Sequence, residues 1–552
     1  MAGRTGAYIA IAFIIGIIIG AAGGYFAAPH KVITKTTTAT KTVSSVVTKT
    51  VTMTKSAVIT KTATKTATVT TTTTASPTTT PKVLKKVTLT VEFGEPWKDL
   101  INLAIPIFKQ EMKKLGYDVT VQKIMMPYGT NYVAKIASDF AAGTAGDVVI
   151  YDSFMTSAFA SAGYLLPLDN FVKNWPGWNE YPKAMQDMVK YKGHVYGLMV
   201  DTDVRMIWYR KDIFHMAGLP TNWQPKTWKD IFDASLQLKS KAAEIEKALG
   251  INEFYPFYIP AGTKWGEGTT MQGFYMVLLG AAKPPYNRLY DFKTGKWIGK
   301  STALYRAFQF YILVYQKLKI GPIQYNYASD VWATHRKVFA EGKVAMDVNG
   351  CWEWGEGWGP HGVAPLKACV AACKGLSGSA YDSCYFKCEA KYVGYAKMPG
   401  YEGGKLGEPK YVTISGGWAI GINAHISPQM QKIAWDFLKV VCSRQVLATF
   451  AAEKGKLCPR LDAVKVPAYA KNSYLKNITE YLKFTTFRPP VPTYPKVSKI
   501  IQEITGQILD GTIKTASQAL NEYYHMLVNT VGAQNVEVLP VNTTPIYTPP
   551  SG

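Results

Sequence analysis

The segment from Lys86 to Asp152 constrains the fold of this chain most, because strand-like and helix-like patterns alternate along it. Lys86 to Phe93 and Asp118 to Ile124 alternate as β-strands do, and an amphipathic helical stretch, Leu100 to Leu115, lies between them. A second helical stretch leads through a glycine-containing turn into Asp147 to Asp152. This order predicts an α/β fold with a mostly parallel sheet. Ligands bind such sheets beyond the carboxyl ends of the strands, which places at a cleft edge Glu95, Trp97, Tyr151 and Asp152.

The stretch from Val412 to Ile422 has the pattern of a buried strand, interrupted by Gly416, Gly417 and Trp418. The two glycines allow another group to come close to the backbone, and the indole offers a flat apolar face. A bulge with a core tryptophan is the alternative. Because similar small-residue turns carry Trp265 and Trp352, and because sugar rings pack on aromatic faces, we favour a small-ligand cleft.

The length and charge of the chain limit its class. A chain of 552 residues is too long for one hydrophobic core, so we expect two or more domains. The formal net charge is +24, but Arg4 and ten lysines precede the first acidic residue, Glu92, so 11 of these charges belong to the N-terminal segment. With no other basic cluster and no nucleic-acid motif, we expect no nucleic-acid partner.

Two N-terminal segments indicate the expected location. Ala7 to Ala28 is uncharged and, at about 20 residues, long enough to span a bilayer as a helix; a signal peptide cleaved near its end is the alternative. The residues before it also resemble an archaeal pilin-like leader. Lys31 to Pro81 repeats Thr and Lys, so we expect a disordered stalk that holds a folded body away from the membrane. The expected divisions are a leader or transmembrane helix (1–30) and a linker (31–82).

Several short motifs then follow one another in the order found in one protein family. They are Gly163 to Asp169, Val195 to Asp212, Gly218 to Asp230, Phe339 to Gly350, Gly416 to Gly421, Ala434 to Lys439, and Pro459 with Arg460. From about residue 85 to 530, the chain resembles the extracellular solute-binding proteins of ABC sugar transporters of the maltose–trehalose type, in an archaeal-style membrane-anchored form. A single motif of this kind would be weak, whereas the ordered set is specific.

The resemblance implies a two-lobed periplasmic-binding-protein type II fold whose lobes close on a solute across hinge strands. It implies capture of a mono- or oligosaccharide for an ABC importer, with permease subunits as partners, without catalysis, cofactor or metal. The implied N-lobe comprises 83–203 and 344–415, the C-lobe comprises 204–343 and 416–535, and a Pro/Thr tail (536–552) follows. The chain would cross between lobes near Asp201 to Arg205, Val344 to Asn349 and Gly416.

The resemblance also implies ligand contacts. Stacking residues fall on Trp352 and Trp418, and we extend this to Trp265; the alternative for each is packing in the core. Polar contacts fall on Glu95, Asp152, Asp203 and Arg460, since carboxylates accept hydrogen bonds from adjacent hydroxyls. Asp203 could instead make a hinge hydrogen bond, and Arg460 could pair with a nearby acid. The complete predicted set adds Trp97, Tyr151, Asn349, Gly416 and Gly417.

Between Glu353 and Lys391 the sequence departs from the family, because an insertion (360–391) carries Cys369, Cys373, Cys384 and Cys388. Cysteines four apart share a helix face, so two antiparallel helices stapled by Cys369–Cys388 and Cys373–Cys384 satisfy the geometry. Four-thiolate zinc is the alternative, but its usual spacing is shorter, and the secretory context favours disulfides. We expect a third bridge, Cys442–Cys458, with Cys351 left over as a buried thiol.

Other functions remain open as alternatives. Glu353 and Glu356 could suggest a glycosidase, but solvated or ligand-binding acids explain them better, and no nucleophile elbow or histidine metal motif occurs. A structural or filament-forming surface protein with the same fold is a second alternative, and a peptide-binding protein is a third. Asn477 and Asn542 stand in N-glycosylation sequons, which fits a glycoprotein at the extracellular face.

Overall fold

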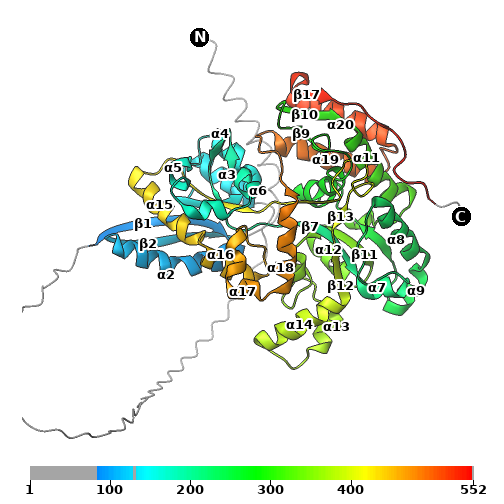
Figure 1. Ribbon diagram of the computed structural model, residues 1–552, viewed down its shortest axis with the longest axis horizontal. Helices are drawn as coiled ribbons and strands as arrows, with labels where there is room; N and C mark the ends of the chain where they lie inside the picture. Colours follow the sequence, from blue (N-terminus) through cyan, green and yellow to red (C-terminus); the bar gives the residue numbers. More distant parts are fainter. Residues whose placement is uncertain (1–83, 128–131, 550–552) are drawn as a thin grey trace, which may run out of the picture. The chain divides into compact units, whose positions relative to one another are not determined.

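The computed structural model describes residues 84–127 and 132–549 (Figure 1). The expected leader or transmembrane helix and the Thr-rich linker lie outside the described residues. Within the described ranges, no helix combines the length and the apolar composition needed to cross a bilayer.

The first lobe is built on a five-stranded sheet, and three of its strands lie where the sequence between Lys86 and Asp152 predicts strands. Its strand order is β2 (Tyr117–Met126), β1 (Lys85–Gly94), β3 (Val148–Asp152), β15 (Trp418–Ile422) and β6 (Leu198–Met199). β1 is parallel to both β2 and β3, which confirms the predicted α/β arrangement, whereas β15 is antiparallel to β3.

Helices cover the first-lobe sheet because their apolar faces need a partner surface. α2 buries Leu100, Ala104 and Phe108 against the sheet, and α15 and α16 pack beside it. The helices of this lobe are α2 (Lys98–Lys114), α3 (Tyr132–Ala142), α4 (Thr156–Ser161), α5 (Asp169–Val172), α6 (Lys183–Met188), α15 (Pro428–Val441) and α16 (Arg444–Lys454). A small hairpin of β4 (Lys190–Tyr191) and β5 (His194–Val195) completes it.

The second lobe is built on a four-stranded sheet in the order β12 (Val393–Ala396), β7 (Arg205–Arg210), β11 (Val344–Gly350) and β8 (Tyr255–Tyr258). Two three-stranded sheets flank it: β13 (Met398–Pro399) with β14 (Tyr411–Ile414) and β16 (Thr485–Thr486), and β9 (Tyr290–Asp291) with β10 (Lys296–Lys300) and β17 (Val536–Val538). Its helices are α7 (Lys211–Met216), α8 (Trp228–Ser240), α9 (Ala242–Leu249), α10 (Tyr275–Leu278), α11 (Thr302–Ile312), α12 (Val331–Ala340), α19 (Tyr494–Leu509) and α20 (Ala516–Val531).

Strand pairing corrects the expected lobe boundaries. We expected 344–415 in the first lobe and 416–535 in the second, but β11 pairs with β7 and β8 of the second lobe, and β15 pairs with β3 of the first. All residues of β11 are buried, so this strand needs neighbours on both sides. The chain therefore crosses from β6 to β7 and back from β14 to β15. It returns to the second lobe through α17 (Pro467–Ala470) and α18 (Ser473–Thr479), ahead of α19.

The cysteine-containing insertion forms two helices, α13 (Lys367–Ala372) and α14 (Gly378–Tyr392), which project from the second lobe in Figure 1. Cys369–Cys388 and Cys373–Cys384 are disulfides with Cα–Cα distances of 5.5 and 5.9 Å, which confirms both predicted pairs. The prediction of a third bridge, Cys442–Cys458, is wrong.

Cys442 and Cys458 are free, buried thiols, as is Cys351. The carbonyl of Cys442 accepts a hydrogen bond from Arg460, and the amide of Cys458 donates to the Tyr469 hydroxyl. Burial raises the pKa of both thiols to about 12. Packing and hydrogen bonds therefore hold this region without a covalent link.

The expected tail from residue 536 is packed against the second lobe. β17 pairs in parallel with β10, and Ile546 and Tyr547 are buried. The Tyr547 ring lies 4.9 Å from that of Phe232, and its hydroxyl donates to Asp233 over 2.9 Å. Apolar side chains within the Pro- and Thr-rich sequence account for this packing.

Candidate functional site

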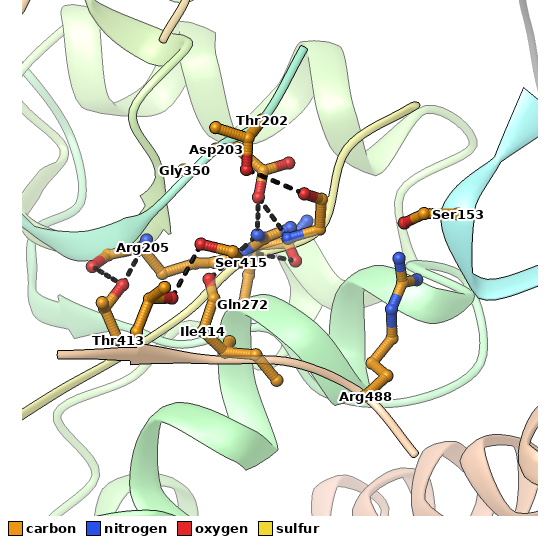
Figure 2. Close-up of polar contacts among 12 residues, drawn as sticks. Ser153, Thr202, Asp203, Arg205, Gln272, Gly350, Thr413, Ile414, Ser415 and Arg488 are labelled. Carbon is orange, nitrogen blue, oxygen red and sulfur yellow. Dashed lines mark hydrogen bonds and ion pairs between the residues drawn. The ribbon is translucent and has the colours of Figure 1, made fainter. Parts of the chain in front are cut away.

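Hydrogen bonds tie the first two interlobe crossings to each other. The Asp203 carboxylate, between β6 and β7, accepts hydrogen bonds from the Gly416 amide at 2.6 Å and from the Arg205 guanidinium. The Thr202 hydroxyl donates to the Gly416 carbonyl over 3.0 Å. Figure 2 shows Asp203 and Thr202 directly above the Ile414–Ser415 segment. The two chain segments at this hinge are therefore held together by hydrogen bonds between their polar groups.

Gly417 adopts a conformation that requires glycine. Its φ is +123°, and a Cβ atom there would lie 2.5 Å from the Asp201 carbonyl oxygen. Its own carbonyl accepts from the Ser153 amide of the first lobe over 3.1 Å. As the sequence predicts, the glycines at positions 416 and 417 allow other backbone segments to come close to this part of the chain.

Trp418 follows this crossing and is half-buried at the start of β15. Its ring centroid lies 4.4 Å from that of Trp97 and 5.4 Å from that of Tyr132. Asp201 accepts from the Trp97 indole at 3.1 Å and from the Trp418 amide at 2.9 Å. Burial raises the pKa of Asp201 to about 6, even though Lys456 opposes the rise. Trp97 is fully buried and packs against Trp418, so it supports that indole from within the first lobe.

Trp352 is the corresponding half-buried indole of the second lobe, just after β11. The Arg205 guanidinium lies 5.2 Å from its ring centroid, and its indole donates to Glu353 over 2.6 Å. Arg336 binds the same carboxylate through two hydrogen bonds of 2.7 and 3.1 Å. A buried ion network therefore fixes the orientation of Trp352.

His335 lies behind Glu353 and adds a second cation to this network. Its Nδ1 is 2.9 Å from Asp347, and its Nε2 is 3.5 Å from Glu353. Burial opposes ionisation, but Arg336 and His335 lower the pKa of Glu353 to about 2. Burial alone would lower the pKa of His335, but the carboxylates of Glu353 and Asp347 outweigh burial and raise this pKa to about 9.

Asp152, at the end of β3, is half-buried and faces the second lobe. Its Oδ1 accepts from Arg488 at 3.0 Å, and Arg488 also lies 3.5 Å from Glu267. Burial lowers the pKa of the Arg488 guanidinium, but the carboxylates of Asp152 and Glu267 outweigh burial and raise it above its ordinary value. This pairing brings first-lobe and second-lobe side chains into one ion cluster.

Besides Trp97, four predicted contacts are buried in the structure. Tyr151, Trp265, Asn349 and Arg460 are all at most 5% exposed, and they pack in the core. The Trp265 indole donates to Asn326 at 3.0 Å, and Arg460 pairs with Asp462 at 2.8 Å. For Trp265 the structure favours the alternative of core packing, and for Arg460 it favours pairing with an acid. Glu95 is exposed at the start of the turn that carries Trp97.

Several charged residues of this region are absent from the contacts predicted from the sequence. Arg488 lies among prolines and threonines with no recognisable motif, and its partner Asp152 is 336 residues away. Glu267 follows the Trp265 turn, and Asp201 and Arg205 stand in the motif from Val195 to Asp212. Only the last three could have been proposed from their neighbours in the sequence. Among the residues that the structure describes, no cluster of His, Cys, Asp and Glu could hold a metal ion.

A cavity of about 520 Å³ lies away from this region, between the end of α9, the end of α12 and the ends of the disulfide-linked helices α13 and α14. Its buried cation, Arg210, is paired with Asp212 at 2.7 Å and with two backbone carbonyls. The hinge region, with its half-buried indoles and carboxylates, offers the better-suited chemistry for a small polar ligand.

Comparison with known proteins agrees with this architecture. The family model described as "Bacterial extracellular solute-binding protein" matches residues 107–477. An uncharacterised ABC transporter extracellular-binding protein of Pyrococcus horikoshii is 24% identical over 259 residues, which cover 44% of this chain. The chain spans 52% of the length of that relative.

Solved structures match over most of the chain. A solute-binding protein of Thermotoga lettingae bound with α-D-tagatose is 25% identical, with a TM-score of 0.58, over 80% of this chain and 100% of that one. The GacH receptor of Streptomyces glaucescens, studied with acarbose, is 21% identical, with a TM-score of 0.60, over 82% of this chain and 99% of its own. At 21% identity, the match with the GacH receptor shows that the two proteins share the two-lobed fold, and it shows nothing about the ligand of this chain.

Proposed function

This chain belongs to the family of bacterial extracellular solute-binding proteins, and we propose that the solute it captures for an ABC importer is a carbohydrate. Capture is reversible binding coupled to closure of the two lobes, without chemical conversion of the ligand. A ligand favours the closed form only through its higher affinity for that form. The tagatose-bound relative supports a sugar as the ligand class.

The observation that carries the proposal is the placement of two half-buried indoles on opposite lobes. Trp418 begins β15 in the first lobe, and Trp352 follows β11 in the second. Each is held from behind, Trp418 by Trp97 and Trp352 by the Glu353 network. Two pre-oriented aromatic faces suit the apolar faces of a sugar ring or of neighbouring rings in an oligosaccharide.

The carboxylates supply the polar half of the proposed site. Arg488 and the Phe154 amide bind Oδ1 of Asp152, and Arg205 and the Gly416 amide bind Oδ1 of Asp203. In each case, among the described residues, the hydrogen bonds fall on one oxygen and leave Oδ2 for a ligand hydroxyl. We assign Asp152 and Asp203 as hydroxyl acceptors, with Glu95 at the rim.

The proposal includes the cellular arrangement. The family is extracellular. We propose that the N-terminal helix anchors this chain in the membrane, that the Thr-rich linker acts as a spacer, and that the partner is the permease of an ABC importer. Asn477 and Asn542 are both exposed and therefore accessible for the proposed glycosylation.

Calorimetric titration of the full chain with neutral mono- and oligosaccharides tests the proposal. We expect one sugar class to bind with a stoichiometry of one per chain. Binding of short peptides, with none by any sugar, would keep the receptor fold and replace the ligand class. Binding of neither, together with polymerisation through the N-terminal helix, would favour the structural alternative.

A further inference from the structure

Arg488 stands between the lobes and contacts both of them. It follows β16, whose pairing with β14 belongs to the second lobe, and it reaches Asp152 in the first lobe at 3.0 Å. Its guanidinium also lies 4.8 Å from the ring centroid of Phe154, another first-lobe residue. Figure 2 shows the side chain extending from its own segment toward the Ser153 loop of the first lobe.

The second lobe holds Arg488 in this orientation. Glu267 lies 3.5 Å from the guanidinium and is itself fixed by two hydroxyls of α19, accepting from Tyr494 at 2.5 Å and from Ser498 at 2.6 Å. These contacts lie within the second lobe, whereas the contacts with Asp152 and Phe154 join Arg488 to the first lobe.

The burial of this cluster makes the interlobe contact energetically relevant. The side chain of Arg488 is 6% exposed and that of Asp152 is 20% exposed, so water and salt screen the pair less than a surface pair. Phe154 also packs against the apolar core of the second lobe, which adds apolar burial beside the ion pair. The pair and the ring therefore form a single interlobe contact.

We propose that Arg488 is a positioning residue for solute capture, which holds the lobes together and fixes Asp152 beside the ligand. This inference rests on the proposed function for the role of Asp152. Arg488 binds Oδ1 of Asp152 and leaves Oδ2 for the ligand. The interlobe ion pair and the bound solute therefore both favour the closed form. The pair raises the fraction of molecules that are closed before the solute arrives.

The test measures the separation of the lobes in the full chain by energy transfer between two dyes. The dyes are attached through Lys113→Cys on α2 and Lys247→Cys on α9, both of which are exposed. Arg488→Met removes the charge and retains an apolar side chain against Phe154. The matched control is Arg444→Met, because Arg444 pairs with Asp462 at 3.9 Å within the first lobe.

Without ligand, we expect Arg488→Met to increase the dye separation relative to the wild type and Arg444→Met. Raising the salt concentration should increase the dye separation of the wild type toward that of Arg488→Met, since salt screens the pair of Arg488 and Asp152. Saturating sugar should restore the wild-type separation, and the sugar Kd should weaken at least about fivefold. Asp152→Asn removes the first-lobe partner of the same ion pair, so it should increase the ligand-free dye separation as well. If Arg488→Met does not fold, the Asp152→Asn measurement tests the proposal.

Equal ligand-free separations in the wild type, Arg488→Met and Asp152→Asn would overturn the proposal. A tighter sugar Kd in Arg488→Met would also overturn it, because the ligand would then have to displace Arg488. If no sugar binds any variant, the proposed function fails, while the ligand-free separations still decide whether Arg488 holds the lobes together.

Discussion

Replacement of Trp418 by Ala separates a ligand-stacking role from a packing role. The indole packs on Trp97 at 4.4 Å and near Tyr132 at 5.4 Å, and the residue is half-buried. A fully buried Trp→Ala change costs about 3–5 kcal/mol of unfolding free energy, so this half-buried residue should cost about 2 kcal/mol. The first lobe should therefore remain folded.

The expected loss of sugar affinity is more than about 1 kcal/mol, or about fivefold in Kd, because stacked rings contribute on this scale. Calorimetric titration measures the affinity, and denaturant unfolding measures the stability. The control is Trp178→Ala, since Trp178 is a half-buried indole of the first lobe that packs near Tyr181 outside the proposed site. An unchanged Kd in Trp418→Ala would remove Trp418 from the site and refute the reasoning.

Three further predictions concern the hinge, the buried histidine and the thiols. Gly417→Ala should lower the unfolding free energy by at least about 2 kcal/mol in denaturant titrations, because φ is +123°; unchanged stability would show that the crossing adapts. The pKa of His335 is raised from 6.5 to about 9, so its contribution, about 3 kcal/mol, is present below pH 6.5 and lost as the pH rises through 9. His335→Gln should flatten this fall in unfolding free energy, and an equally steep fall would contradict the assignment. Thiol titration of the denatured, unreduced chain should give three thiols, whereas a single thiol would show that Cys442 and Cys458 are bridged.

Local patterns predicted the secondary structure well because they depend on neighbouring residues. The alternation in Lys86 to Phe93 became β1, and the amphipathic stretch from Leu100 became α2. The lobe to which a strand belongs is not a local property. β11 and β15 both read as buried strands, and only pairing between distant segments shows that each belongs to the lobe opposite to the one expected.

The same distinction separates the confirmed disulfides from the wrong one. The spacing of four between Cys369 and Cys373 defines a helix face, and the hairpin pairs follow from it. Cys442 and Cys458 were paired by nearness in sequence, although α16 lies between them. Their burial in the core could not be inferred from the sequence.

Residue type identified only part of the candidate site. Trp418 and Trp352 are half-buried, whereas Trp265, in an equally suggestive turn, is 3% exposed and bonded to Asn326. Exposure depends on the tertiary packing of each turn rather than on its own residues. Arg488 was missed for the related reason that its partners come from distant segments in both lobes.

The most direct test of carbohydrate capture is the thermal unfolding midpoint of the full chain measured against a concentration series of sugars. A ligand that binds only the folded state raises this midpoint in proportion to the logarithm of its concentration once the site is saturated. The account predicts such a rise with one class of neutral sugar, and a smaller rise at equal concentration for Trp418→Ala. A midpoint that no sugar changes at any concentration would contradict the account.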